Sequence, residues 1–137
     1  MNSFHLQIVS LDGKFFDDEV NQVSLRTIDG DISIRAGHIP YVTAIGVGEC
    51  RVYEINGEKP RRAACIGGFV SVSKEMVLIA ATTFEWAQDI DYERATRAKE
   101  RAESILASGD SSDYNRDLGK SKLARANTRL KVVDNNK

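Results

Sequence analysis

Several features that would mark particular classes of protein are missing from this sequence of 137 residues. No apolar run approaches the ~20 residues that a helix needs to cross a bilayer, so we expect no membrane-spanning helix. The first residues, MNSFHLQIVSLDG, have neither a basic opening nor a long apolar stretch, so we expect no signal peptide. Any association with a membrane is therefore expected to be peripheral and to depend on a partner.

Cysteine and histidine are also scarce. Cys50 and Cys65 are the only cysteines, and their spacing matches no metal motif, so we expect two buried, reduced thiols. His5 and His38 are the only histidines, and neither stands in a metal-binding or triad pattern. No GxGxxG, P-loop or GxSxG sequence is present either. The chain is thus predicted to have no metal site and no catalytic site of its own.

What is present, from residue 4 to about residue 84, is the pattern of an all-β domain. Short segments rich in β-branched and aromatic residues follow one another, and several alternate with a period of two. Asp12-Gly13, Asp29-Gly30 and Asn56-Gly57 are typical of hairpin turns because their backbones reach positive φ easily. Strands this close together predict a sandwich or a barrel. The segments are FHLQIVS, QVSLRTI, DISIRA, YVTAIGVG, CRVYEI, RRAACIGG, FVSVS and MVLIAAT.

From Asp91 onward the apolar period becomes that of a helix. Asp91 is predicted to cap this helix at its N-terminus, and Gly109 suits the left-handed position after its end. A second helix is expected from the capping residues Ser111, Ser112 and Asp113 to about Val132, although Gly119 in its interior costs about 1 kcal/mol relative to alanine. The apolar stripe of the first helix consists of Ala95, Ala98, Ala102, Ile105 and Leu106.

Two helices joined by a short polar segment are expected to form an antiparallel hairpin. Because their alanine-rich faces bury little area, we predict that the hairpin is weakly held and can move. The sequence therefore predicts an all-β sandwich over residues 1–88, followed by an α-helical hairpin over residues 89–137.

Charge is distributed unevenly between these two parts. Residues 1–90 contain 12 acidic and 8 basic residues, whereas residues 91–137 contain 8 acidic and 11 basic ones. Lys122, Arg125 and Arg129 are spaced so that they line one stripe of the second helix. Such a basic stripe favours binding to phosphate or to a cluster of carboxylates, and a solvated helix face is the alternative.

Two blocks of the sequence resemble the epsilon subunit of F-type ATP synthases. GDISIRAGHIPYVTAIGVG is similar to that family's signature, in which a strand leads into a Gly-His-x-Pro loop. IGGFVSVSKEMVLIAATTFEWAQDIDYERATRAKERAE resembles the block in which a Gly-Gly hairpin is followed by the linker and the first C-terminal helix. The resemblance covers residues 4–132, and its fold agrees with the one expected above. The chain departs from the family at Ala36, commonly a proline, at Trp86 and at Gly119.

The resemblance implies a non-catalytic subunit of the central rotor stalk. Its sandwich would contact the gamma subunit and the c ring, with Asp31 and His38 on loops that face the ring. Its helical hairpin would inhibit ATP hydrolysis by extending into the alpha/beta catalytic head, where Lys122, Arg125 and Arg129 would meet acidic groups. The resemblance places such a subunit peripherally at the cytoplasmic face of the bacterial plasma membrane, with no direct membrane insertion.

The resemblance also implies a nucleotide site, because some bacterial members bind ATP when the hairpin is folded down. Their motif, I/L-D-x-x-R-A, is complete here, and further contacts match residues in the last strand and in both helices. ATP would then be a regulatory ligand, and no cofactor would be required. The implied nucleotide-binding residues are Glu85, Ile90, Asp91, Arg94, Ala95, Arg101, Arg125 and Arg129.

One alternative of another class is a nucleic-acid-binding β-domain with a basic helical tail. The positive tail supports it, whereas the negative first part and the lack of interleaved basic and aromatic residues on the strands speak against it. We therefore expect no nucleic-acid partner.

Overall fold

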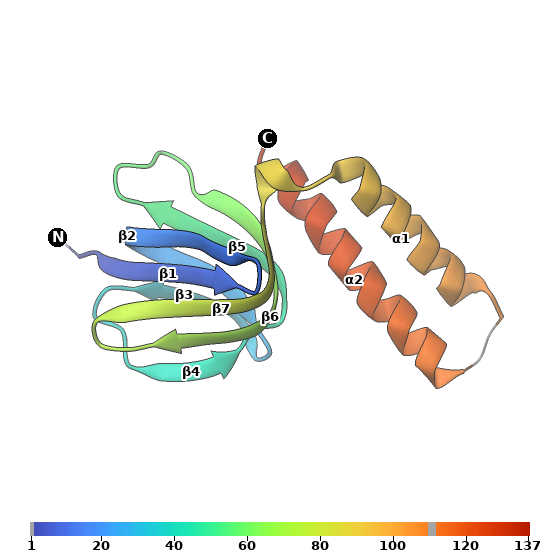
Figure 1. Cartoon of the computed structure of the whole chain (residues 1–137), viewed down its shortest axis with the longest axis horizontal. Coiled ribbons are helices and arrows are strands. Elements are labelled where there is room, and N and C mark those ends of the chain that lie inside the picture. The colour runs from blue at the N-terminus through green and yellow to red at the C-terminus, as the bar shows by residue number, and fades with distance from the viewer. Residues whose placement is uncertain (1, 110–111) are drawn as a thin grey trace.

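The computed structural model describes residues 2–109 and 112–137, with strands and helices in separate parts of the molecule (Figure 1). Seven strands form a β-sandwich, and two helices form an antiparallel hairpin beside one end of it, as predicted. A short 3-10 helix, η1, joins the two parts. The strands are β1 Phe4–Ser10, β2 Gly13–Thr27, β3 Gly30–Arg35, β4 Tyr41–Ala44, β5 Val47–Glu54, β6 Arg61–Val72 and β7 Met76–Trp86. The helices are η1 Ala87–Asp89, α1 Tyr92–Ala107 and α2 Asp113–Asn135.

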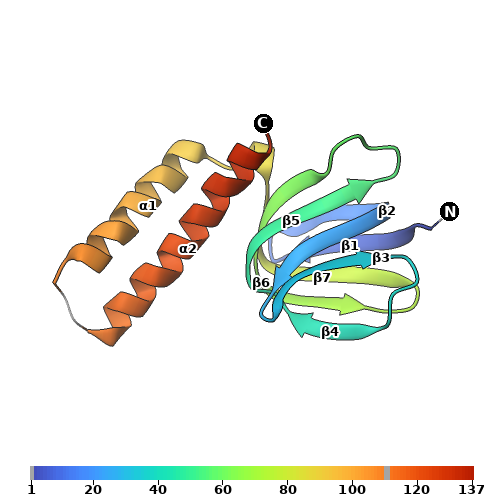
Figure 2. The same ribbon diagram turned by 180° about the vertical axis from the view of Figure 1, so that it is seen from behind.

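The sheet closes on itself. Its strand order is β1-β7-β6-β5-β2-β3, β4 pairs with β6, and β1 pairs with β2 as well as with β7. All pairings are antiparallel except that between β1 and β7. Viewed from behind, β2 and β3 lie in front of β1 and β7, so the two layers enclose the core (Figure 2). Fully buried side chains at its centre include Leu6, Ile8, Val23, Val52 and Ile79.

The predicted strands and turns are present, with differences in extent. YVTAIGVG, predicted as one segment, is divided between β4 and the start of β5. β2 begins at Gly13, whereas the sequence predicted a strand only from Gln22. The segments predicted as two strands around Gly67-Gly68 form one long strand, β6. The three hairpin dipeptides lie at turns between strands, as expected.

Two consecutive glycines let β6 bend within its length. Gly67 and Gly68 have positive φ of 71° and 96°, and a Cβ on Gly68 would lie 2.0 Å from the carbonyl oxygen of Ala80. β6 pairs with β5 up to Ile66 and with β4 from Phe69, so the bend lies where it changes partner. The two glycines therefore allow close packing inside a strand and do not form a turn.

The helix ends agree with the predicted capping. The Asp91 carboxylate accepts a hydrogen bond of 3.1 Å from the backbone N–H of Arg94, and α1 ends before Gly109, which has a positive φ. Of the three predicted capping residues, Ser112 caps α2, Asp113 is the first residue of the helix, and Ser111 lies outside the described residues. α2 continues to Asn135, three residues beyond the predicted end.

Gly119 lies at the contact between α1 and α2, which its position in the sequence did not indicate. It is buried, and a Cβ built there would lie 3.1 Å from Leu106 Cδ2 and 3.2 Å from Ile105 Cγ2. The missing side chain therefore allows α1 and α2 to approach closely, so Gly119 is a packing contact as well as a residue of low helix propensity.

The hairpin is folded down against the sandwich through a small set of contacts. α2 packs on β5, β6 and η1, and α1 packs on α2. The buried side chains at this interface, Ala64, Ala87, Ile90 and Val132, form a cluster separate from the sandwich core. Near the C-terminus, Asn135 donates a 3.1 Å hydrogen bond to Glu49. Within the described part of the chain, no helix is both long and apolar enough to cross a membrane.

Candidate functional site

A cleft of about 600 Å³ lies between the two helices and the end of β7. It is lined by Glu85 from β7, by the segment that joins η1 to α1, and by the facing sides of α1 and α2. All eight residues assigned to nucleotide binding by the resemblance line this cleft, namely Glu85, Ile90, Asp91, Arg94, Ala95, Arg101, Arg125 and Arg129. The folded hairpin thus brings together residues that are up to 44 positions apart in the chain.

One ion pair crosses the cleft and links the hairpin to the sandwich. Arg129 Nε lies 2.5 Å from Glu85 Oε1, and both side chains are partly exposed. Next to it, the guanidinium of Arg61 stacks over the ring of Trp86 at 3.9 Å, and Trp86 is buried at the end of β7. These contacts fix the strand end from which Glu85 projects.

The other basic side chains of the cleft are not held by ion pairs with the described residues. Arg125 donates to the backbone oxygen of Ser121 at 3.4 Å and to its hydroxyl at 3.1 Å. Arg94, Arg101 and Lys122 are exposed and have no ion pair within the part of the chain that the structure describes. Guanidinium and ammonium groups in this situation can bind an anion without first breaking an ion pair.

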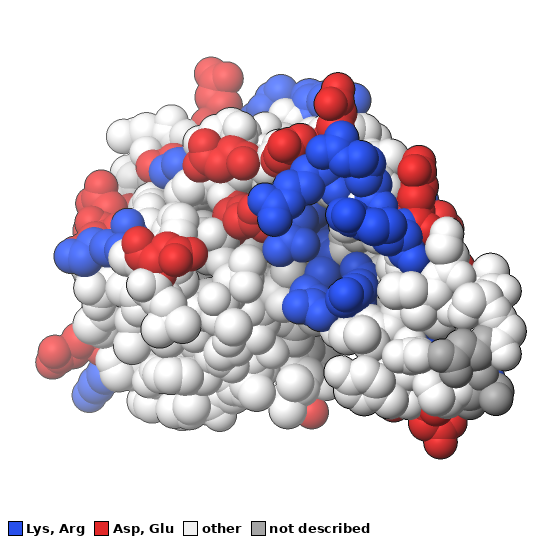
Figure 3. All heavy atoms as spheres, turned by 45° about the vertical axis from the view of Figure 1, so that its right-hand side comes forward, with Lys and Arg blue, Asp and Glu red and all other residues white. Residues whose placement is uncertain are grey.

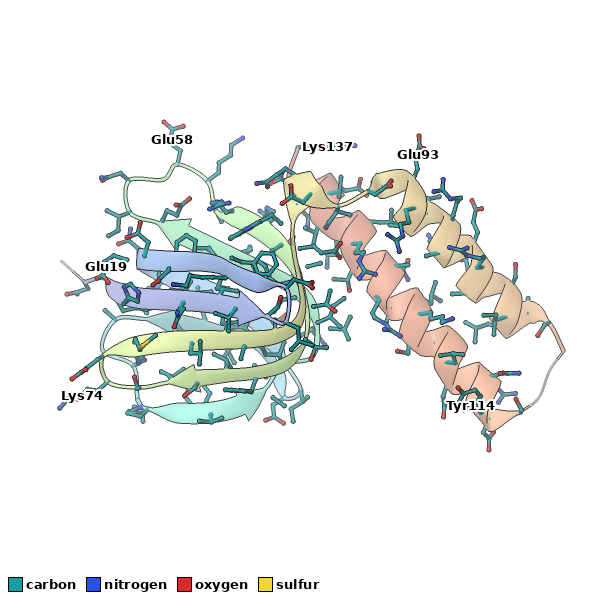
Figure 4. The ribbon with its side chains drawn as sticks, in the orientation of Figure 1. Glu19, Glu58, Lys74, Glu93, Tyr114 and Lys137 are labelled. Carbon is teal, nitrogen blue, oxygen red and sulfur yellow. The ribbon has the colours of Figure 1, made fainter. Side chains whose placement is uncertain are left out.

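Basic side chains outnumber acidic ones around the cleft. Figure 3 shows Lys and Arg atoms gathered over the hollow between the sandwich and the hairpin. The acidic lining residues are Glu85, Asp89 and Asp91, and the basic ones are Arg94, Arg101, Lys122, Arg125 and Arg129. Side chains on the opposite side of the hairpin, such as Glu93, point away from α2 (Figure 4). The excess of positive charge therefore favours an anionic ligand.

The predicted basic stripe of α2 belongs to this cleft. Lys122, Arg125 and Arg129 all line it in the folded hairpin. The stripe is nevertheless accessible to solvent, since Lys122 is exposed and Arg125 and Arg129 are partly exposed, so the alternative of a solvated helix face remains open. Four lining residues were not predicted for the nucleotide site, because their contribution depends on how the helices pack: Asp89, Ala98, Ile105 and Lys122.

Asp31 and His38 are not brought together. Asp31 is the second residue of β3, is exposed, and lies 3.5 Å from Arg26 on β2. The prediction that it lies on a loop is therefore wrong, because the hairpin pairing of β2 with β3 extends to Gly30. His38 follows the opposite end of β3, where its ring packs edge-on to Phe4 at 5.5 Å. Its Nδ1 is buried and makes no hydrogen bond with the described residues.

The cysteines offer no accessible thiolate. Cys50 and Cys65 are buried and unbridged, as predicted. Burial raises the pKa of Cys65 to about 12 and raises the pKa of Cys50 well above its usual value, so both thiols are protonated at neutral pH. Among the described residues, no group of three or more His, Cys, Asp or Glu side chains is placed to hold a metal ion.

Comparison with known families accounts for the described fold. A family described as ATP synthase, Delta/Epsilon chain, beta-sandwich domain matches residues 3–87. A second, described as ATP synthase, Delta/Epsilon chain, long alpha-helix domain, matches residues 88–134.

Individual proteins give the same result over nearly the full length. The ATP synthase epsilon chain of Caldicellulosiruptor bescii is 40% identical over 138 residues, covering 100% of this chain and 98% of its own. The epsilon chain of Staphylococcus haemolyticus is 38% identical, covering 98% of both. A chain of the Euglena gracilis mitochondrial ATP synthase (OSCP/F1/c-ring) has a TM-score of 0.80 with 23% identity, covering 92% of this chain and 78% of its own. At that identity the structural likeness supports the fold alone.

Proposed function

Because the chain belongs to the delta/epsilon family of ATP synthase subunits, we propose that it is a non-catalytic subunit of the rotor stalk. It joins the gamma subunit to the c ring and lies peripherally at the cytoplasmic face of the membrane. The sandwich is the part that docks, and Asp31 and His38 contribute to its contacts with these partners.

An exposed apolar surface supports docking of the sandwich. β4 pairs only with β6, and the pairing of Ala44 with Phe69 places these residues and Val42 on one face. Val42 is 66% exposed and Phe69 is 44% exposed, and Ile39, two residues before β4 begins, is 80% exposed. Contiguous exposed apolar side chains on an edge strand are typical of a protein-binding surface. The gamma subunit is the proposed partner for this face.

We further propose that the hairpin regulates the complex by leaving the sandwich. Among the described residues, a small apolar cluster and two polar contacts hold it, so detachment costs little compared with unfolding the sandwich. Once extended, Lys122, Arg125 and Arg129 would face outward and pair with carboxylates of the catalytic head, which blocks ATP hydrolysis. Screening by salt should weaken that contact.

ATP is the proposed ligand of the cleft. The observation that carries this proposal is that all eight implied contact residues line one cavity of about 600 Å³, within the usual size of small-molecule sites. Its walls come from the sandwich and from both helices, so the cavity exists only while the hairpin is folded. ATP therefore stabilises the folded hairpin and relieves inhibition.

Isothermal titration of the full chain with ATP tests this assignment. We expect binding by the wild type and a loss of about tenfold or more in Arg94→Ala and in Arg125→Ala, since each removes a charge-assisted contact. Arg116→Ala is the matched control, because Arg116 is exposed on α2 outside the cleft. Absence of heat with the wild type, or an equal loss in the control, would refute ATP binding in the cleft.

The nucleic-acid alternative gains no support. Its basis was the basic tail, and the cations of that tail which form a stripe line a cleft that also contains three carboxylates. Such an arrangement suits a small anionic ligand better than a phosphate backbone.

A further inference from the structure

The packing of Gly119 fixes which residues of the two helices lie at the same height. Gly119 of α2 contacts Ile105 of α1, and the helices are antiparallel. With a rise of 1.5 Å per residue, Arg101 lies about 6 Å from Ile105 along α1, and Lys122 lies about 4.5 Å from Gly119 along α2, in the same direction. Arg101 and Lys122 therefore face each other across the cleft at nearly the same level.

The charge of a third basic side chain lies near the level of Arg101 and Lys122. Arg125 lies one turn further along α2, but its guanidinium turns back and donates to Ser121. Its charge is thus close to the height of Lys122. We call Arg101, Lys122 and Arg125 the basic end of the cleft, and the acidic lining residues Glu85, Asp89 and Asp91 all lie away from it.

The opposite end of the cleft is mixed in charge and partly apolar. Along the helix axes, Arg94 lies about 16.5 Å from Ile105 and Arg129 lies about 15 Å from Gly119, so both are roughly 10 Å from the basic end. Ile90 and Ala95 offer apolar contact there, and Glu85 and Asp91 offer acceptor oxygens. A nucleoside suits this mixed end, so its phosphate chain runs toward the basic end.

We propose that Lys122 is a specificity-determining residue that binds the terminal phosphate of a nucleoside triphosphate. Lys122 is exposed and has no ion pair with the described residues, and its flexible stem carries a compact charge. A triphosphate extends far enough to meet it, whereas a diphosphate stops one phosphate short. This proposal rests on nucleotide binding in the cleft and adds to it the group that distinguishes ATP from ADP.

Titration of the full chain with ATP and with ADP, in buffer without magnesium, tests the role of Lys122. In Lys122→Gln we expect ATP to bind about tenfold more weakly, because one charge-assisted contact is lost. The affinity for ADP should change by less than about twofold. Lys122→Arg should retain most of the preference for ATP. Lys120→Gln is the matched control, since Lys120 is exposed on the same helix outside the cleft, and it should leave both affinities unchanged.

The possible results separate this proposal from the one on which it rests. If the wild type binds ATP but Lys122→Gln binds it equally well, the role of Lys122 is refuted while the nucleotide site stands. The same holds if the variant loses affinity for ATP and for ADP to the same extent. If the wild type binds neither nucleotide, both proposals fail.

Discussion

At the scale of single residues, Glu85 and Arg129 connect the sandwich to the hairpin. Their ion pair is partly exposed, so its contribution to stability is expected to be less than about 1 kcal/mol. Glu85→Gln should therefore leave the sandwich folded but should raise the amide exchange rate in the last turns of α2. Glu19→Gln is a suitable control, because Glu19 pairs with His5 at 3.3 Å at the end of the sandwich far from the helices (Figure 4). Equal exchange in the two variants would contradict this role.

A second residue-scale prediction concerns pH. The hydrogen bond to Asp17 raises the pKa of His5 above 6.5, and hydrogen bonds from Lys14 and then His5 lower the pKa of Asp17 below 3.8. The raised pKa of His5 means that the cluster stabilises the fold below pH 6.5, an effect lost as pH rises through the pKa of folded His5. The lowered pKa of Asp17 adds stability above pH 3.8, lost as pH falls through the pKa of folded Asp17.

Urea unfolding at pH 5.5 and at pH 8 measures this effect. The wild type should lose part of its stability between the two values, and His5→Gln should lose less, because it has no imidazole to deprotonate. An identical pH dependence in the two proteins would show that the contacts of His5 with Asp17 and Glu19 do not contribute.

Residues whose role is local were predictable from the sequence, and those whose role depends on packing were not. Asp91 caps the helix that follows it, and the signal lies within four residues of the chain. The ion pair of His5 with Asp17 needs the antiparallel register of β1 and β2, and the place of Lys122 in the cleft needs the height set by Gly119. Neither the register of the strands nor the relative height of the two helices follows from composition or periodicity.

At the scale of elements, Gly119 sets the contact between α1 and α2. Gly119→Ala should raise the intrinsic helix propensity of α2 by about 1 kcal/mol, but its methyl group would press on Leu106 and Ile105. We therefore expect faster amide exchange in α1 and weaker ATP binding, although α2 itself gains propensity.

Asn127→Ala is the matched control for this substitution, because Asn127 is exposed on the same helix. It should gain propensity without disturbing α1. Slower exchange in α1 of Gly119→Ala would mean that the added methyl group is accommodated and that close approach is not required.

Among the strands, alternating segments were predicted correctly and the irregular ones were not. The first part of β2 contains Asp17, Asp18 and Glu19 in a row, which conceals a period of two, and its pairing with β1 makes it a strand. The two glycines within β6 have the composition of a turn, and only the neighbouring Ala80 backbone shows that they lie inside a strand.

At the scale of the whole molecule, the two apolar clusters are separate, so the sandwich should fold without the hairpin. Deletion of residues 91–137 should leave assembly with the gamma subunit intact and should raise ATP hydrolysis by the parent complex severalfold, because it removes the helices that we propose to be inhibitory. An ATPase rate that does not change would contradict inhibition by the hairpin. Loss of assembly would contradict a docking role confined to the sandwich.

The overall architecture was predictable because each part has a strong local period. The arrangement of the parts was not, since five apolar side chains and two polar contacts join them in the part of the chain that the structure describes. That weak junction is also the physical basis of the proposed regulation.

Amide exchange of α1 and α2, measured with and without ATP, tests the central claim most directly. We expect both helices to exchange much faster than the strands in the absence of ATP, and to become protected when ATP fills the cleft, while the sandwich core is unaffected. Helices that exchange as slowly as the strands without ATP, or that show no change when ATP is added, would contradict a hairpin held down by nucleotide.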